Sequence, residues 1–244
     1  MSAPSLFVSH GAPTFALAPG RVGPQLTALG STWNAVRAIV VVSAHWQTHG
    51  VAVTTTTQPG TIHDFVGFPP QLYRLRYEPP GAPGAAQTAL ELLRAAGFDA
   101  RADAQRGLDH GAWVPLMHIR PAADTPVFAV SLPNDLDPPT AWRLGRALAP
   151  LRSANIMLLG SGSLTHNLAD YRAFERGAEP YVERFAAWVR ARVRARDAAA
   201  LLNYRRRAPH AVRAHPTEDH FLPLFVALGA SDEHDEPTVL EGSI

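Results

Sequence analysis

The chain of 244 residues contains no cysteine. This absence excludes a disulfide framework, a catalytic thiolate, an iron–sulfur cluster and every zinc site built on cysteine. Any bound metal ion must therefore be held by nitrogen and oxygen atoms. Histidine, of which the chain has 11, is the residue that supplies nitrogen ligands to transition metals.

A strong charge of either sign is also absent. The 22 basic and 21 acidic residues leave a formal net charge of +1. No broad basic field is available to hold a nucleic-acid backbone, so we expect no nucleic-acid partner. The arginines at 190, 192, 194 and 196 are interpreted as the solvated side of a helix.

Long apolar runs are missing as well. None approaches the ~20 residues that a membrane span needs. The N-terminal residues MSAPSLFVSH have neither a charged start nor a long apolar run, so no signal peptide is expected and the predicted location is cytoplasmic. Hydrophobic residues nevertheless make up 46% of the chain. This composition and length predict one folded domain over residues 1–244.

Apolar runs typical of strands alternate with helical patterns along the chain. We expect strands at residues 5–9, 38–43, 51–56, 98–104, 126–132 and 155–160, and the start of another at Val239. We expect helices at residues 84–96, 112–119, 139–151, 179–202 and 219–228. The alternation predicts an α/β fold with a central, largely parallel or mixed β-sheet flanked by helices. Ligands of such sheets bind beyond the carboxyl ends of the strands.

Histidines stand in short turns, and several of those turns follow predicted strands. The turns are SHGAP at His10, SAHW at His45, GSLTHN at His166, and HPTEDH at His215 and His220. Strands that end near a histidine can gather imidazoles at one edge of a sheet, and neutral imidazoles commonly hold a divalent transition metal. Gly160 and Gly162 before His166 let the backbone approach another group closely.

The spacing of His215 and His220 excludes one familiar zinc motif. They are five residues apart, whereas an H-E-x-x-H pair needs a spacing of four on one helical face. Pro216 favours extended backbone at His215, which places His220 in the first turn of the last predicted helix. From the residues alone, either histidine can bind a metal while the other serves the substrate or a supporting role.

A loop at residues 60–82 is rich in proline, glycine and aromatic residues, and long ordered loops of this kind are often functional. It carries His63, Phe65, Phe68, Tyr73 and Tyr77. The aromatic side chains either offer flat contact to a ring-shaped substrate or cover the core. His110, in GLDHGAW, is either a substrate-binding or a structural residue. The histidines at 49, 118, 210 and 234 lack such context and are interpreted as ordinary surface or hydrogen-bonded residues.

Six motifs occur in a fixed order along the chain: SHGAP, SAHW, IHDFVGFP, GLDHGAWVPL, GSGSLTHN and HPTEDHFLPL. Together they resemble the class III extradiol ring-cleavage dioxygenases, in particular the branch similar to 4,5-DOPA dioxygenase. The resemblance runs from His10 to about Gly229. Each motif alone is weak, but six in the same order make the resemblance specific.

The resemblance implies one divalent metal ion per chain, with His10, His45 and His220 as ligands. It implies that His166 is an acid/base catalyst beside the metal, with a role as fourth ligand as the alternative. His110 becomes a second catalytic histidine, and His215, His63, Phe65 and Phe68 become substrate-binding residues. The broader class has a carboxylate as its third ligand. Three neutral imidazoles suit Zn(II) as well as Fe(II), so both metals stay open.

The activity implied is cleavage of the aromatic ring of a catechol-type substrate, DOPA-like or related, with O2. Fe(II) suits oxygenation, whereas zinc has no redox chemistry. Two alternatives use the same histidines: a zinc-dependent hydrolase of a small aromatic substrate, and a non-catalytic binding protein stabilised by zinc. A monomer or a small homo-oligomer is expected, and the resemblance implies a further segment after Ile244.

Overall fold

Four parallel strands lie at the centre of the computed structural model, which describes residues 2–173 and 180–242. They are β1 (Ser5–Ser9), β8 (Ile156–Gly162), β2 (Ala38–Ser43) and β6 (Val127–Ala129), in that spatial order. Every residue of β2 and β8 is buried, as in strands covered on both faces. In β2, Ile39 and Val41 face one hydrophobic core while Val40 and Val42 face the other.

Two further sheets of two short strands each accompany the central sheet. Strand β4 (Val51–Thr54) pairs in parallel with β5 (Ala100–Asp103), and an antiparallel bridge between Val53 and Val130 joins β4 to the segment after β6. Strand β3 (Gln47–Thr48) pairs in parallel with β7 (Leu132–Pro133). The prediction of a largely parallel or mixed sheet is therefore confirmed.

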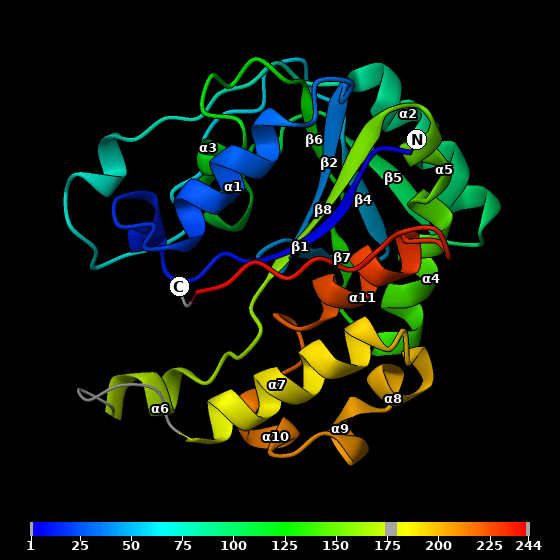
Figure 1. Cartoon of the computed structure of the whole chain (residues 1–244). Coiled ribbons are helices and arrows are strands. Elements are labelled where there is room, and N and C mark those ends of the chain that lie inside the picture. Colours follow the sequence, from blue (N-terminus) through cyan, green and yellow to red (C-terminus); the bar gives the residue numbers. More distant parts are fainter. Residues whose placement is uncertain (1, 174–179, 243–244) are drawn as a thin grey trace.

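Helices cover both faces of the sheet (Figure 1). On one face lie η1 (Pro13–Ala16), α1 (Val22–Ser31) and α3 (His110–Ile119). On the other lie α2 (Pro83–Ala95), α4 (Pro138–Leu148), α5 (Pro150–Ser153) and α11 (Leu222–Ala230). The α/β architecture predicted from the alternating pattern is confirmed. Among the described helices, none is both long enough and apolar enough to cross a membrane.

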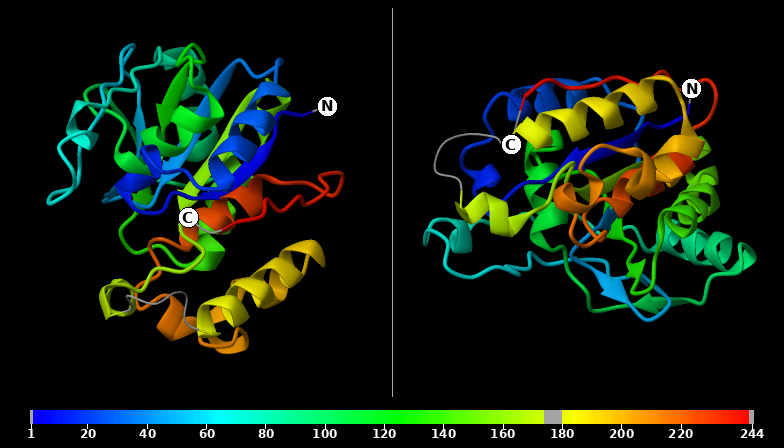
Figure 2. Two further views of the ribbon diagram at one scale, coloured as in Figure 1. Left: turned by 60° about the vertical axis from the view of Figure 1, so that its left-hand side comes forward. Right: turned by 90° about the horizontal axis from the view of Figure 1, so that it is seen from below.

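A further layer of helices packs outside α4 and α11, drawn in yellow and orange in Figure 2. It contains α7 (Pro180–Arg194), α8 (Ala198–Leu202), α9 (Tyr204–Arg207) and α10 (Ala211–Ala214). The short helix α6 (Leu168–Ala173) leads into it from β8, and η2 (Leu72–Arg74) lies in the loop after β4. Phe185 and Tyr204 join this layer to the core formed with α11.

Several predicted boundaries are wrong. The helix expected over 179–202 is broken, because Arg196 has a positive φ of 53° and Asp197 caps α8 by accepting a hydrogen bond from the Ala200 amide. Residue 179 lies outside the described residues. The last helix begins at Leu222, with Pro223 in its first turn, so His220 precedes it. Helix α1 was not predicted, and no strand forms within the described residues 236–242.

Arg152 is a buried cation that joins distant parts of the chain, with a side chain 3% exposed. Its Nε donates to the Ala3 carbonyl at 2.6 Å and its Nη1 to the Ala230 carbonyl at 2.7 Å. Both terminal nitrogens also bind Asp235, at 2.6 and 2.7 Å. The guanidinium therefore holds the N-terminal segment, the end of α11 and the segment that follows it.

We expect Arg152→Met to lower the free energy of unfolding by about 3 kcal/mol, because two buried carbonyls lose a charged donor. Methionine keeps most of the apolar stem, so the change isolates the guanidinium. Urea unfolding followed by circular dichroism measures the difference. Arg184→Met is the control, since Arg184 is exposed on α7 and should change stability by less than about 0.5 kcal/mol. A loss below 1 kcal/mol for Arg152→Met would contradict this account.

Candidate active site

The carboxyl ends of three central strands meet at one edge of the sheet. The parallel register places Ser9 of β1 beside Gly162 of β8, and Ser43 of β2 beside Ser161 of β8. His10 directly follows β1, His45 follows β2 by two residues, and His166 lies four residues after β8. The histidine-bearing turns therefore lie together at the predicted edge.

His10, His45 and His220 converge. The Nε2 atoms of His10 and His45 are 3.0 Å apart, and those of His45 and His220 are 3.2 Å apart. The ring centroids form a triangle with sides of 4.8, 4.8 and 5.4 Å. Two imidazole nitrogens that bind one ion at about 2.0–2.1 Å lie about 2.9 Å apart at a right angle and about 3.3 Å apart at the tetrahedral angle. Both nitrogen spacings thus fit ligands of a single ion, and ligand atoms of His10, His45 and His110 also lie within 4.8 Å of one another.

The charge state of these rings also suits a metal. Burial holds the pKa of His10 well below its usual value, and the neighbouring histidines lower it further. Burial, with the nearby His110 and His220, lowers the pKa of His45 to about 3 although Asp64 opposes the shift. Both rings are therefore neutral at pH 7 and offer the lone pair that a metal ion requires.

Each of the three rings has an oxygen atom near its rear nitrogen. Ser161 Oγ donates to the Gly111 carbonyl and accepts a hydrogen bond from His10 Nδ1, 3.0 Å away. Asp219 Oδ2 binds Nδ1 of His220, and Asp64 Oδ2 lies 3.7 Å from Nδ1 of His45. The hydrogen bonds to Ser161 and Asp219 keep hydrogen on Nδ1 of His10 and His220 and leave Nε2 of both rings free for the ion. Sequence reasoning missed Asp64, Ser161 and Asp219 as partners of the ligands.

Two further histidines flank the three. His166 stacks on His220, with ring centroids 3.5 Å apart and planes inclined by 5°. Burial lowers the pKa of His166 to about 4, and His220 contributes to the shift. The His110 ring lies 4.1 Å from that of His45 and 5.4 Å from that of His10. The structure thus brings together all five histidines for which metal binding or catalysis was predicted.

Close backbone packing holds the segment that carries His166. The Ser163 amide donates to the His220 carbonyl, and the His166 amide donates to the Ala214 carbonyl, each at 2.8 Å. A Cβ atom on Gly162 would lie 2.1 Å from the His220 carbonyl oxygen, so only glycine fits there. The close approach predicted for this glycine is confirmed.

His215 is fully buried beside this segment. Its Nε2 donates to the Leu164 carbonyl at 2.9 Å, and its ring packs against Phe221, Phe185 and Tyr204. Its Nδ1 has no hydrogen-bond partner among the described residues. These contacts place His215 under the backbone that leads to His166, in an aromatic environment.

Burial lowers the pKa of His215 to about 4, against the opposing hydrogen bond to the Leu164 carbonyl. Below pH 6.5 the unfolded chain binds a proton here that the folded chain excludes, so stability falls as pH drops from 6.5 towards 4, by about 1.4 kcal/mol per pH unit.

His215→Gln removes this titrating group, so the stability of the variant should depend less on pH. In metal-free protein, we expect the free energy of unfolding to fall between pH 7 and 4.5 by about 2 kcal/mol less in His215→Gln than in the parent. Urea unfolding at both pH values tests this, with exposed His234→Gln as control. An unchanged pH dependence in His215→Gln would refute the assignment.

The predicted substrate-binding aromatics gather next to His110. The Phe65 ring meets that of His110 edge-on at 5.7 Å and contacts Phe68 at 5.4 Å. His63 lies within 6.0 Å of Phe65, Tyr73 and Trp113, and its Nε2 is 3.1 Å from the Leu75 carbonyl. Tyr77 is buried, and its hydroxyl donates to the Arg120 carbonyl. Phe65 and Tyr77 therefore help to cover the core, while Phe68 is partly exposed.

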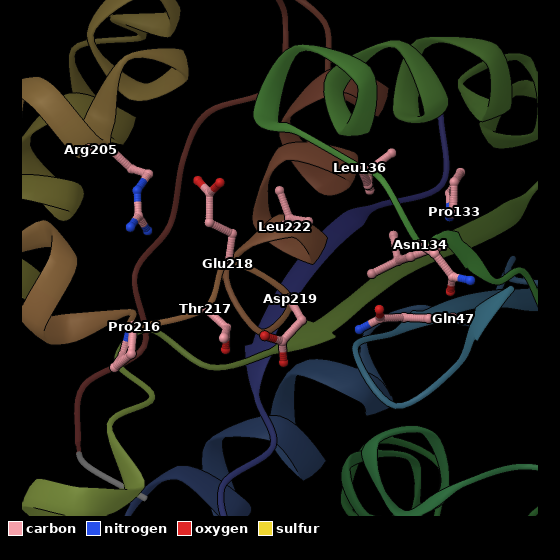
Figure 3. A pocket seen from close by; sticks show the side chains of 11 residues that line it. Gln47, Pro133, Asn134, Leu136, Arg205, Pro216, Thr217, Glu218, Asp219 and Leu222 are labelled. Atoms are coloured by element: carbon pink, nitrogen blue, oxygen red, sulfur yellow. The ribbon is translucent and has the colours of Figure 1, made fainter. Parts of the chain in front are cut away.

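We call His10, His45, His110, His166 and His220 the histidine cluster. A cavity of about 490 Å³ adjoins this cluster on the side of Asp219 (Figure 3). Figure 3 shows Gln47 reaching from β3 towards Asp219, with Glu218 and Arg205 farther along the cavity. Asp219 belongs to both the cavity and the histidine cluster, because its side chain lines the cavity and its carboxylate binds His220. None of the histidines lines the cavity, which was not predicted from the sequence.

Comparison with known proteins gives a family and relatives that carry the name of a dioxygenase. The family described as the catalytic LigB subunit of aromatic ring-opening dioxygenase matches residues 27–242. A 4,5-DOPA dioxygenase extradiol from Beta vulgaris is 37% identical over 98% of this chain and 91% of its own length. A protein of the same name from Escherichia coli K12 is 38% identical over 97% of this chain and 88% of its own.

Two further matches extend the comparison. The dioxygenase tasH of Hapsidospora irregularis is 35% identical over 87% of this chain and 70% of its own length. The crystal structure of an uncharacterized protein from Escherichia coli K12 superposes with a TM-score of 0.72 at 33% identity. The superposition covers 88% of this chain and 83% of the other, so the two share the fold.

Proposed function

This chain belongs to the family of the catalytic LigB subunit of aromatic ring-opening dioxygenases, and we propose that it opens the ring of a catechol-type substrate with dioxygen at a single metal ion. The resemblance predicted from six motifs is confirmed, and the chain is a ring-cleaving dioxygenase. The observation that carries the finer proposal is the convergence of three imidazoles at the edge of the sheet. The family match over residues 27–242 supports one catalytic domain.

The names of the relatives support the substrate class. The similar proteins from Beta vulgaris and Escherichia coli carry the name 4,5-DOPA dioxygenase extradiol and match almost all of this chain. We therefore propose a DOPA-like or related catechol. Phe65 and Phe68, next to His110, are proposed to contact its ring, with His63 behind them.

The proposed metal ligands are His10, His45 and His220. When bound there, Fe(II) supplies the redox chemistry that oxygenation needs, which Zn(II) lacks. Burial keeps the rings of His10 and His45 neutral. Hydrogen bonds from Nδ1 of His10 to Ser161 and from Nδ1 of His220 to Asp219 turn Nε2 of both rings towards the proposed ion. His215 supports the segment of His166 through the Leu164 carbonyl.

His166 is proposed to move the substrate proton. It is neutral at pH 7, so it can accept a proton from a catechol hydroxyl and return it to the opened product. Its face-to-face contact with His220 holds it directly beside the proposed metal ligands. His110, on the other flank beside His45, offers a second nitrogen to the substrate or to dioxygen.

Oxygen consumption tests the proposal. The protein is prepared without oxygen, loaded with Fe(II) or Zn(II), and supplied with a panel of catechols that differ in their side chains. We expect the Fe(II) form to consume one O2 per catechol and to yield a ring-opened product that absorbs visible light, while the Zn(II) form does neither. No uptake with any catechol, together with hydrolysis of a small aromatic ester or amide by the Zn(II) form, would overturn the proposal in favour of a hydrolase.

A further inference from the structure

Asp64 makes more contacts with the histidine cluster than any other carboxylate that the structure describes. Its Oδ1 accepts a hydrogen bond from the His110 amide at 2.8 Å, and its Oδ2 lies 3.0 Å from His110 Nδ1. The same Oδ2 is 3.7 Å from Nδ1 of His45. The carboxylate therefore holds both the backbone and the ring of His110 and reaches one proposed metal ligand.

The hydrogen bond determines which nitrogen of His110 carries hydrogen. Asp64 Oδ1 accepts from the His110 amide, and an ionised carboxylate has no hydrogen to donate, so its Oδ2 accepts as well. Nδ1 of His110 must therefore be the donor. In the neutral ring this leaves Nε2 with the lone pair, and Nε2 has no hydrogen-bond partner among the described residues.

Contacts of the two or three residues before Asp64 hold this part of the loop in place. Thr61 forms a parallel bridge with Leu108, and the Ile62 carbonyl accepts a hydrogen bond from the Trp113 indole at 2.9 Å. These contacts fasten the start of the 60–82 loop to the segment that enters α3. His110 is the first residue of α3, and Asp109 caps that helix by accepting from the Ala112 amide.

We propose that Asp64 is a positioning residue that fixes His110 with its hydrogen on Nδ1 and its lone pair on Nε2, and thereby couples the aromatic 60–82 loop to the catalytic histidines. This inference rests on the proposed function, in which His110 meets the substrate or dioxygen. Phe65, the next residue, packs edge-on against the same ring, so movement of the loop displaces the carboxylate and the aromatic contact together. An ionised carboxylate behind the ring also stabilises the cation that forms when Nε2 accepts a proton.

A double-mutant cycle tests whether Asp64 acts through His110. We expect Asp64→Asn to lower kcat by about 100-fold, the usual scale of lost acid–base catalysis, with KM changed less than about threefold. Asp64→Asn combined with His110→Gln should be no slower than His110→Gln alone. Glu78→Gln is the matched control, because Glu78 is an exposed carboxylate of the same loop and should leave kcat unchanged. Multiplicative losses in the double variant, at equal metal content, would overturn the proposal.

Nitrogen NMR of histidine gives a readout that does not depend on turnover. In the Zn(II)-loaded protein labelled with 15N-histidine, the signals of His110 are those missing in His110→Gln. We expect the Nδ1–H form in the parent and in Asp64→Glu, and the Nε2–H form in Asp64→Asn, whose amide can donate to Nδ1. If Asp64→Asn does not fold, Asp64→Glu with the parent decides the matter: an Nε2–H ring in either one refutes the proposal.

The two arms separate this inference from the proposed function. If no catechol is cleaved, the proposed function fails while the tautomer measured by NMR still supports or refutes the role of Asp64. If a catechol is cleaved but the tautomer is the same in the parent and in Asp64→Asn, the role of Asp64 fails alone.

Discussion

Replacing His45 by alanine is expected to empty the proposed metal site. The His45 Nε2 atom lies 3.0 Å from that of His10 and 3.2 Å from that of His220, so it is the central member of the three. Removing a residue that only hydrogen-bonds to a metal ligand weakens metal binding by about 10–100-fold. Removing a ligand itself should therefore weaken metal binding by more than about 100-fold. Metal per chain, measured by elemental analysis after dialysis against a metal buffer, should fall from one to near zero.

His49→Ala is the matched control for this prediction. His49 stands in the turn between β3 and β4, four residues from His45, and is exposed. Its removal should leave the metal content at one ion per chain. His10→Ala and His220→Ala should behave like His45→Ala. Full occupancy in all three ligand variants would show that the ion is bound elsewhere or that the cluster holds none.

The gathering of the histidine turns at one edge of the sheet could be predicted from sequence, because parallel strands bring their carboxyl ends to the same edge. The apolar runs at 5–9, 38–43 and 155–160 could be identified as strands, the last two of them buried, and each is followed by a histidine turn. Parallel pairing then brings those turns together without further assumptions. The glycines before His166 carried their own signal, because tight backbone packing requires them.

The partners of the histidines could not be predicted in the same way. Asp64 and His110 are 46 residues apart, and their contact depends on how a long irregular loop folds against α3. The carboxylates did carry a weak signal, since Asp64 follows His63 and Asp219 precedes His220 in sequence. Adjacent residues point in different directions, however, so adjacency did not show that Asp64 serves His110 rather than His63.

Helix boundaries were predicted wrongly where local capping overrode the apolar pattern. The apolar spacing continues through residues 179–202, but the Asp197 cap and the left-handed Arg196 divide the segment. At the last helix, Pro223 suits the first turn, and the start at Leu222 leaves His220 in the preceding turn. That shift matters for the site, because the turn lets the His220 ring reach His45 while its carbonyl accepts from Ser163.

Replacing His166 by alanine is expected to separate substrate binding from turnover. The three proposed metal ligands remain, so the Fe(II) protein should still bind a catechol, as measured by titration without oxygen. Turnover should fall by about 100-fold or more, because no group then accepts and returns the hydroxyl proton. Unchanged turnover would remove His166 from the proposed mechanism.

The stacking of His166 on His220 offers a second explanation of such a loss, and one further variant distinguishes the two. The rings lie 3.5 Å apart and nearly parallel, so removing His166 also removes a face of the ligand's packing. His166→Phe keeps a flat ring on that face but has no nitrogen to carry a proton. If proton transfer is the role of His166, phenylalanine should be as slow as alanine while metal content stays at one ion per chain. Recovery of turnover in His166→Phe would instead assign His166 the packing of His220, because only the aromatic face would then be needed.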